Sequence, residues 1–323
     1  MPIFNQLAPH LNQIHTQLQE SVRESFPVSL RDPILYFLES TGKKIRPLLT
    51  ILSCEAVGGK MANAMPAALG IELFHDFTLI HDDIMDRDEL RRGRYTIHTK
   101  WGEDVAILVG DALVGLAYER FLQCDTRHLR QIMQLFTDTL IKVCEGQALD
   151  KEFEKREDVN LEQYLDMITK KTAWLIRLST QVGAILGNGS QEQVGLMTHF
   201  GNQLGIAFQI QDDWLDYAGE ENTLGKKVGS DLKLDKKTYI SLKYQEILSQ
   251  KPDLKNMYPG RLSGFNSLPD LKKALLDLEI AQQIEQLIDS YFNDALQALE
   301  KVLPLSNENQ IYQVVLSLQK RQS

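Results

Sequence analysis

Two short stretches of the chain carry paired carboxylates at the spacing of one helical turn. HDDIMD and QDDWLD both contain the pattern DDxxD, and each lies near the C-terminal end of a segment with helical spacing. On a helix, Asp82 and Asp86 point within about 40° of each other, and so do Asp212 and Asp216. Like charges at this spacing repel by roughly a few tenths of a kcal/mol, so a cation between them is needed to make the arrangement favourable.

The cation that best suits these pairs is Mg²⁺. It is a hard, octahedral ion that proteins usually hold by one or two carboxylates, with waters and substrate phosphates completing its shell. Zinc would require His and Cys ligands, and a calcium EF-hand would require D-x-D-x-D-G, which DDIMDRDELRRG does not match. One DDxxD is more often a solvated acidic helix end. Two copies, each on an otherwise apolar helix, favour a metal site.

Basic residues accompany both acidic motifs. They form three groups: Arg91 and Arg92 after the first motif, Lys43, Lys44 and Arg46 in GKKIRP, and Lys226, Lys227 and Lys236 in LGKKVGSDLKLDKK. Arginine offers a planar fork to phosphate oxygens and lysine a compact charge, so together they bind polyphosphates. A magnesium-bridged diphosphate would satisfy both kinds of charge. Taken singly, Lys44, Lys227 and Lys237 are expected to be solvated surface side chains, whereas Arg91 and Arg92 are expected to be functional.

Composition limits the class of protein. The chain has 323 residues, of which 43% are hydrophobic, and this is typical of a soluble globular protein. Its formal charge of −9 argues against a nucleic-acid partner. Cys54, Cys124 and Cys144 form no CxxC pair, so we expect small core residues in a reducing compartment rather than a disulfide framework. No signal segment and no long apolar window occur, which predicts a cytoplasmic protein without stable membrane insertion.

Helical spacing dominates the chain, and sustained strand-type alternation is hard to find, so the sequence predicts an all-α fold. Helices are expected at about 4–24, 30–41, 44–57, 62–88, 102–122, 126–150, 160–187, 191–218, 235–249, 269–301 and 307–320. The longest irregular stretch, residues 251–270, contains three prolines and two glycines and is expected to be a surface loop. No shift in composition separates its flanks, so a single domain over 1–323 is predicted.

The motifs resemble those of the trans-isoprenyl diphosphate synthases, the family of farnesyl and geranylgeranyl diphosphate synthases. The similarity runs from Gly42 to Lys236 and includes GKKIRP, FHDFTLIHDDIMDRDELRRG, VGDAL, EGQ, KT at 171–172, FQIQDDWLD and GKKVGSD. Both acidic motifs in order, with RRG after the first, form a specific signature. The resemblance implies an antiparallel helical bundle around a deep central cavity, of the class I isoprenoid synthase type. It also implies a homodimer and Mg²⁺, expected as about three ions.

The resemblance further assigns roles residue by residue. It implies that Asp82, Asp86 and Asp212 are Mg²⁺ ligands, with Asp83, Asp213 and Asp216 in the same acidic rims and Asp216 as a further metal ligand. The allylic diphosphate would be held by Arg91, Lys171, Thr172, Gln209, Lys226 and Lys236, and isopentenyl diphosphate by Lys43, Arg46, His75 and Arg92. The catalytic set would be Asp82, Asp83, Asp86, Arg91, Lys171, Asp212 and Lys226. One departure from the family, KLDKKT in place of xEGKxT, makes the match of Lys236 less direct.

The implied reaction is prenyl transfer. Ionisation of an allylic diphosphate of C5 to C15 leaves a cation that the isopentenyl double bond attacks, and catalysis is mostly electrostatic. In the family, bulky residues just before the first aspartate form a floor that stops chain growth. Here these are Phe77 and Thr78, with Phe74 further up the helix. They imply a C15 to C20 product, farnesyl or geranylgeranyl diphosphate.

Three other functions compete with this one. A class I terpene cyclase shares the acidic chemistry, but its second motif is usually NDxxSxxxE, which QDDWLD does not match. An HD-type metal phosphohydrolase would use the dyad His81 and Asp82, but it leaves DDWLD and the lysine groups unexplained. A non-catalytic subunit that regulates an active synthase is the third, and the intact motifs argue against it. Product length and the preferred primer stay open at this point.

Overall fold

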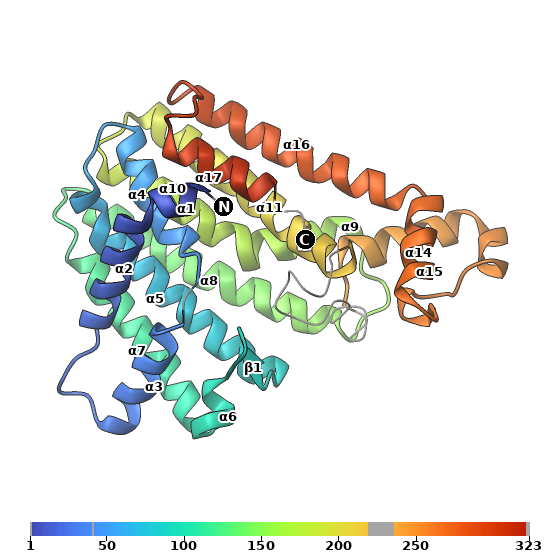
Figure 1. The fold of residues 1–323 in the computed structure, drawn as a ribbon, viewed down its shortest axis with the longest axis horizontal. Coiled ribbons are helices and arrows are strands. Elements are labelled where there is room, and N and C mark those ends of the chain that lie inside the picture. Colours follow the sequence, from blue (N-terminus) through green and yellow to red (C-terminus); the bar gives the residue numbers. More distant parts are fainter. Residues whose placement is uncertain (1, 41, 219–235, 321–323) are drawn as a thin grey trace. The chain divides into compact units, whose positions relative to one another are not determined.

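The computed structural model describes residues 2–40, 42–218 and 236–320. Within these ranges the ordered elements are helices, apart from one hairpin of two short strands (Figure 1). The all-α prediction is confirmed.

The chain divides into two compact units. Unit 1 comprises Met1–Thr137, Leu175–Thr198 and Leu299–Val314, and unit 2 comprises Asp138–Trp174, His199–Ala298 and Val315–Ser323. The single domain expected over 1–323 stays a prediction.

Unit 1 is built around one long apolar helix. Its complete elements are α1 (Pro2–Gln6), α2 (Ala8–Glu20), α3 (Val28–Leu38), α4 (Ile45–Ala56), α5 (Met61–Asp86), β1 (Leu90–Arg91), β2 (Arg94–Tyr95), α6 (Ile97–Trp101) and α7 (Glu103–Leu122). Helix α5 packs against both α4 and α7 (Figure 1). A Cβ at Gly70 of α5 would lie 2.9 Å from the Phe121 ring, so glycine there permits the close approach of α7. This packing fixes the helix that ends in the first acidic motif.

Unit 2 contains an α-helix that continues directly into a π-helical turn. Its complete elements are α9 (Leu161–Ile168), the π-helical turn η1 (Thr169–Ala173), α14 (Tyr239–Gln250), the short 3₁₀ turns η2 (Pro252–Asn256) and η3 (Leu262–Gly264), and α15 (Leu268–Asp277). Five helices contribute to both units: α8 (Leu129–Phe153), α10 (Trp174–Leu186), α11 (Gln191–Ala218), α16 (Ile280–Glu300) and α17 (Gln310–Gln319). Reciprocal capping boxes begin α9, at Asn160 and Gln163, and α14, at Thr238 and Ser241.

Several predicted boundaries need correction. The helix expected at 4–24 is two helices, with Leu7 between them, and it ends at Glu20. The helix expected at 269–301 breaks where Glu279 adopts a left-handed φ of 59°. The hairpin at β1 and β2 was not predicted, because strands of two residues are too short to show alternation. The loop expected at 251–270 ends earlier, at Ser267, because α15 begins at Leu268, and it contains two 3₁₀ turns.

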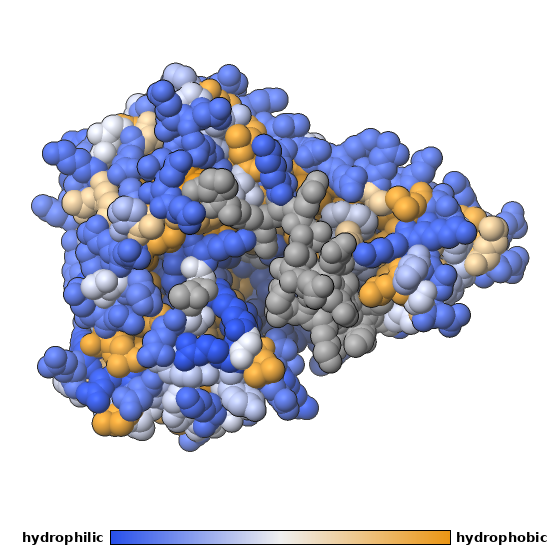
Figure 2. Space-filling model, viewed as in Figure 1, coloured by the Kyte–Doolittle hydropathy of each residue, from blue (hydrophilic) through white to orange (hydrophobic). Residues whose placement is uncertain are grey.

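Surface and core follow the composition. In the part of the chain that the structure describes, no helix is both long and apolar enough to span a bilayer. Figure 2 shows polar residues over most of the visible face, with apolar residues in small separate groups. Cys54 and Cys124 are buried free thiols, as expected, whereas Cys144 is exposed, which contradicts its expected place in the core.

Candidate active site

The first acidic motif forms the last turn of α5. The helix ends at Asp86 because Arg87 adopts a left-handed conformation with φ 56°, and the Asp88 amide donates to the Asp83 carbonyl at 3.0 Å. Asp82 and Asp86 are each half-buried and lie one turn apart. The C-terminal end of a helix carries partial negative charge, so two carboxylates there are unfavourable without a cation. The position suits a bound metal ion.

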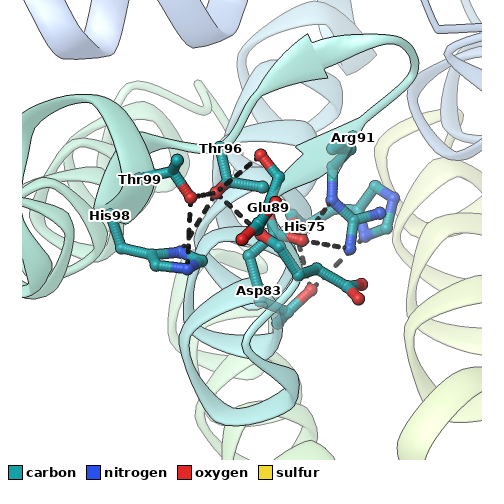
Figure 3. A network of polar contacts seen from close by, with 9 residues as sticks. His75, Asp83, Glu89, Arg91, Thr96, His98 and Thr99 are labelled. Atoms are coloured by element: carbon teal, nitrogen blue, oxygen red, sulfur yellow. Dashed lines mark hydrogen bonds and ion pairs between the residues drawn. The ribbon is translucent and has the colours of Figure 1, made fainter.

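The middle aspartate of this motif is held differently. Asp83 is only 2% exposed; its Oδ1 accepts a hydrogen bond from Arg91 Nε at 2.7 Å and forms an ion pair with Nη2 at 2.6 Å (Figure 3). Burial raises the pKa of Asp83, and the hydrogen bond and charge of Arg91 oppose that rise. The carboxylate therefore orients one of the two arginines that follow the first acidic motif. Its expected place in the catalytic set stays a prediction.

The second arginine sits in the turn of the hairpin. Arg92 and Gly93 have φ of 53° and 75°, which makes a two-residue turn between the paired Arg91 and Arg94. Arg92 Nη1 donates to Ser40 Oγ at 3.2 Å. A Cβ at Gly42 would lie 2.6 Å from that same nitrogen, so any larger residue there would displace the guanidinium from this position.

Contacts with α3 anchor the base of the hairpin. The Tyr36 hydroxyl donates to the Tyr95 carbonyl at 2.9 Å. The Arg94 guanidinium lies 4.0 Å from the centre of the Tyr36 ring, and its Nη2 is 3.2 Å from Glu39 Oε2. Thr96 Oγ1 donates to the Asp88 carbonyl at 2.8 Å and so ties the second strand to the end of α5. Figure 3 shows Thr96 beside His98 and Thr99 in this network.

Two of the residues predicted for isopentenyl diphosphate, Arg46 and His75, contact each other in unit 1. Arg46 Nη1 lies 3.0 Å from His75 Nε2, and because an arginine can only donate, Nε2 must accept. The ring proton then sits on Nδ1, 3.4 Å from Thr78 Oγ1. Burial, followed by the charge of Arg46, lowers the pKa of His75 well below its ordinary value. His75 is therefore neutral, while Lys43 is exposed near the start of α4.

Lys44 is not the solvated side chain that was predicted. It is 8% exposed, and its Nζ lies 2.9 Å from Glu72 Oε1 and 3.8 Å from Asp76 Oδ2. Burial lowers the pKa of Lys44, but the attraction of Asp76 and Glu72 outweighs it and the pKa rises. Glu72 and Asp76 form another carboxylate pair one turn apart on α5. The same spacing that identified DDxxD could have predicted that this pair needs a cation.

In unit 2, Lys171 and Thr172 lie on the π-helical turn η1. Lys171 Nζ donates to Asp150 Oδ2 at 2.6 Å. A Cβ at Gly146, in the EGQ stretch, would lie 2.3 Å from the Lys171 amide nitrogen, so this glycine lets α8 pass directly against η1. π-helical turns are frequent at functional sites. Asp150 was missed by the sequence reasoning, although it lies one helical turn after Gly146.

The second acidic motif repeats the arrangement of the first. Asp213 is 8% exposed, and its two oxygens accept from the Tyr164 hydroxyl at 2.6 Å and from Gln209 Nε2 at 2.8 Å. Asp212 and Asp216 are half-buried on the last turns of α11. In each motif, the middle carboxylate is therefore turned inward while the outer pair keeps partial access to solvent. Tyr164 was not predicted from the sequence.

Of the two lysines after this motif that are predicted to bind the allylic diphosphate, the structure describes only Lys236. Lys226 lies outside the described residues, as does Lys227. Lys236 is half-buried, and its carbonyl accepts from the Thr238 amide at 3.0 Å and from Ser241 Oγ at 2.9 Å, which holds it at the start of α14.

The predicted chain-length residues join an aromatic layer in unit 1. Phe74 is fully buried, with its ring centre 5.6 Å from that of Phe77 and 5.4 Å from that of Phe136. The Phe77 ring stands edge-on to His81 at 4.6 Å. Thr78 is bound to its own helix, because its hydroxyl donates to the His75 carbonyl at 2.7 Å. Phe77 keeps part of its surface accessible, and the chain-length role of these residues stays a prediction.

The donor set fits Mg²⁺. Among the residues that the structure describes, no three or more His, Cys, Asp or Glu side chains converge on a preformed cation site. Mg²⁺ needs no such cage, because one or two carboxylates with substrate phosphates and waters are sufficient. The outer pairs, Asp82 with Asp86 and Asp212 with Asp216, have that composition.

Comparison with known proteins gives a consistent assignment. Residues 27–275 match the sequence profile of the polyprenyl synthetase family. The chain is 43% identical over 252 residues to the short chain isoprenyl diphosphate synthase of Methanothermobacter thermautotrophicus, covering 78% of each protein. It is 35% identical to the geranylgeranyl diphosphate synthase of Sulfolobus acidocaldarius, over 93% of this chain and 91% of that one.

Solved structures agree. The crystal structure of geranylgeranyl pyrophosphate synthetase from Pyrococcus horikoshii superimposes with a TM-score of 0.88 at 32% identity, over 99% of both chains. The profile match covers both acidic motifs and most of the chain between its ends. The chain therefore belongs to the polyprenyl synthetase family.

Proposed function

We propose that the protein is a short-chain trans-prenyltransferase that condenses isopentenyl diphosphate with an allylic diphosphate of C5 to C15. The product is a prenyl diphosphate of C15 to C20, in line with the relatives named short chain isoprenyl and geranylgeranyl diphosphate synthase. The observation that carries the proposal is the shared design of the two acidic motifs. In both, the outer carboxylates remain accessible at a helix end while the middle one is buried and hydrogen-bonded.

The proposed roles follow from these contacts. Asp82, Asp86, Asp212 and Asp216 would hold Mg²⁺, which when bound neutralises negative charge on the departing diphosphate. Arg91 and Lys171, each oriented by a carboxylate, would bind the allylic diphosphate together with Thr172, Gln209, Lys226 and Lys236. The expectation of about three Mg²⁺ ions belongs to the proposal as well.

Isopentenyl diphosphate would lie against Arg46, His75, Arg92 and Lys43. Neutral His75 can offer hydrogen bonding without adding charge, so the attraction for the diphosphate comes from the arginines and the lysine. The carbon–oxygen bond of the allylic substrate breaks and the diphosphate leaves with its electron pair. The isopentenyl double bond then supplies the electrons of the new carbon–carbon bond, and a neighbouring carbon gives a proton to the released diphosphate so that its C–H electrons form the new double bond. No protein nucleophile is required for these steps.

A product assay tests the proposal. Purified protein is incubated with Mg²⁺, an allylic diphosphate and isopentenyl diphosphate, and the products are identified by chromatography. We expect a longer prenyl diphosphate, no turnover in EDTA and recovery on adding Mg²⁺. A hydrocarbon plus pyrophosphate would indicate the terpene cyclase, phosphate release alone the phosphohydrolase, and no turnover with Mg²⁺ present the regulatory subunit.

Phe77→Ala is expected to shift the product toward longer chains, because it removes a partly accessible ring from the aromatic layer on α5. The measurement is the product distribution at fixed substrate ratio. Phe26→Ala is the matched control, since Phe26 is also half-buried in unit 1 but lies between α2 and α3. An unchanged distribution in Phe77→Ala would discard Phe77 as the floor of the pocket.

A homodimer and a cytoplasmic location complete the proposal. On α7, Leu108 and Leu122 are each 59% exposed and lie two heptads apart, so both fall on one side of the helix. These two exposed leucines are candidates for a subunit contact. Light scattering of the purified protein measures the mass and so decides the state of association.

A further inference from the structure

A chain of hydrogen bonds links three elements of unit 2. The Tyr164 hydroxyl on α9 donates to Asp213 Oδ2 on α11 at 2.6 Å. Gln209 Nε2, one turn earlier on α11, donates to Asp213 Oδ1 at 2.8 Å. Thr172 Oγ1 on η1 donates to Gln209 Oε1 at 2.7 Å. Both oxygens of Asp213 and both ends of the Gln209 amide are therefore engaged.

The geometry of these hydrogen bonds allows only one orientation of the Gln209 amide. The carboxylate of Asp213 can only accept, so Gln209 must turn its amide nitrogen toward it and its amide oxygen toward Thr172. Tyr164 is 1% exposed, and Asp213 and Thr172 are each 8% exposed, so water competes little for these bonds. Buried, fully satisfied networks of this kind rigidify the elements that they join.

Two glycines, one on α8 and one on α11, allow these helices to pack directly against the backbone of η1. A Cβ at Gly146 of α8 would lie 2.3 Å from the Lys171 amide nitrogen, and one at Gly205 of α11 would lie 2.5 Å from Ala173 Cα. Both contacts are with backbone, which cannot move aside as a flexible side chain would. The π-helical turn thus packs tightly on two helices, and the hydrogen bond from Thr172 to Gln209 fixes a side chain of η1 against α11.

We infer that Tyr164 is a positioning residue for the allylic diphosphate half of the site. By fixing Asp213 it sets the last turns of α11, where Asp212 and Asp216 present their carboxylates. Through Gln209 it also fixes Thr172 and the adjacent Lys171. This role rests on the proposed function, because Tyr164 acts only through residues assigned to Mg²⁺ and the allylic substrate.

The test is Tyr164→Phe, which keeps the buried ring and removes only the donor. Loss of a residue that supports metal or substrate ligands typically costs about 10- to 100-fold in affinity or activity. We expect KM for the allylic diphosphate and the Mg²⁺ concentration for half-maximal rate each to rise by about 10-fold or more. KM for isopentenyl diphosphate should stay within about twofold, because Arg46, His75 and Arg92 have none of these contacts.

The matched control is Tyr244→Phe. Tyr244 is also fully buried in unit 2, and its hydroxyl donates to the Pro259 carbonyl at 2.6 Å, so the same chemical group is removed from a bond of the same length. This variant should leave both KM values and the Mg²⁺ requirement unchanged. Thermal melting of the two variants measures the structural cost of each deletion.

A double-mutant cycle with Asp213→Asn checks that Tyr164 acts through this carboxylate. The double variant should show a rise in the allylic KM no larger than that of Asp213→Asn alone. Equal changes in Tyr164→Phe and Tyr244→Phe, or equal rises in both substrate KM values, would overturn the inference while leaving the proposed function intact. Absence of prenyl transfer in the unmodified protein would instead overturn the proposed function.

Discussion

Asp82→Asn is expected to lower kcat by at least about 10²- to 10³-fold, the loss typical of removing one group that stabilises developing negative charge. Asp82 is half-buried at the C-terminal end of α5, one turn from Asp86, and its neighbour Asp83 is already engaged by Arg91. Asparagine keeps the shape but loses the charge that attracts a cation. The measurement is kcat at saturating substrate over a range of Mg²⁺ concentrations.

The same substitution should leave the fold at least as stable. Removing a negative charge from the end of a helix relieves repulsion within the motif and with the helix dipole. The melting temperature of Asp82→Asn should therefore equal or slightly exceed that of the unmodified protein. Asp277→Asn, at the exposed C-terminal end of α15, removes the same charge from the end of a helix outside the acidic motifs and should leave kcat unchanged. Full activity in Asp82→Asn would remove this residue from the metal site.

Lys44→Met is expected to destabilise the protein by about 3–5 kcal/mol, because it leaves Glu72 and Asp76 buried without their counter-charge. The side chains of Lys44, Glu72 and Asp76 are 7%, 5% and 3% exposed, so solvent screens them little. Urea unfolding measures the free energy. KM for isopentenyl diphosphate should also rise, since Lys44 lies at the start of the helix that carries Arg46.

The exposed lysine at position 60 supplies the control. Lys60→Met removes the same charge from a solvated side chain in the same unit and should change the free energy of unfolding by less than about 0.5 kcal/mol. Comparable losses in Lys60→Met and Lys44→Met would contradict the assignment of a buried ion cluster.

The cluster also predicts a dependence of stability on pH. Burial raises the pKa of Asp76 from 3.8 to about 7. The unfolded chain therefore releases this proton first, so this contribution to stability is present at low pH and is lost as the pH rises from about 4 toward about 7. Lys44→Met should extend that loss to higher pH, because it removes a charge that lowers the pKa of Asp76, and a further Asp76→Asn change should remove the loss. Unfolding free energies measured across this range test the sign.

Local patterns were sufficient for part of the site. The carboxylates of DDxxD lie one turn apart on α5 and α11, as i,i+4 spacing requires. The sequence did not predict contacts between residues that are distant along the chain, and it did not predict elements of only two residues. Lys44 was assigned to the surface, the hairpin that carries Arg91 went unseen, and Asp150 was not recognised as a partner of Lys171.

By itself the sequence determined the all-α class, the family, and which residues could meet a metal ion and diphosphates, because these follow from periodicity and from the chemistry of side chains a few positions apart. Only the tertiary structure decided which carboxylate of each motif turns inward and what it binds there. Asp213 meets Tyr164 across 49 residues of chain, and Lys44 meets Glu72 only because α4 packs on α5. Such pairs form only when two helices pack together. The spacing of residues within one helix does not predict which faces of the two helices will be in contact.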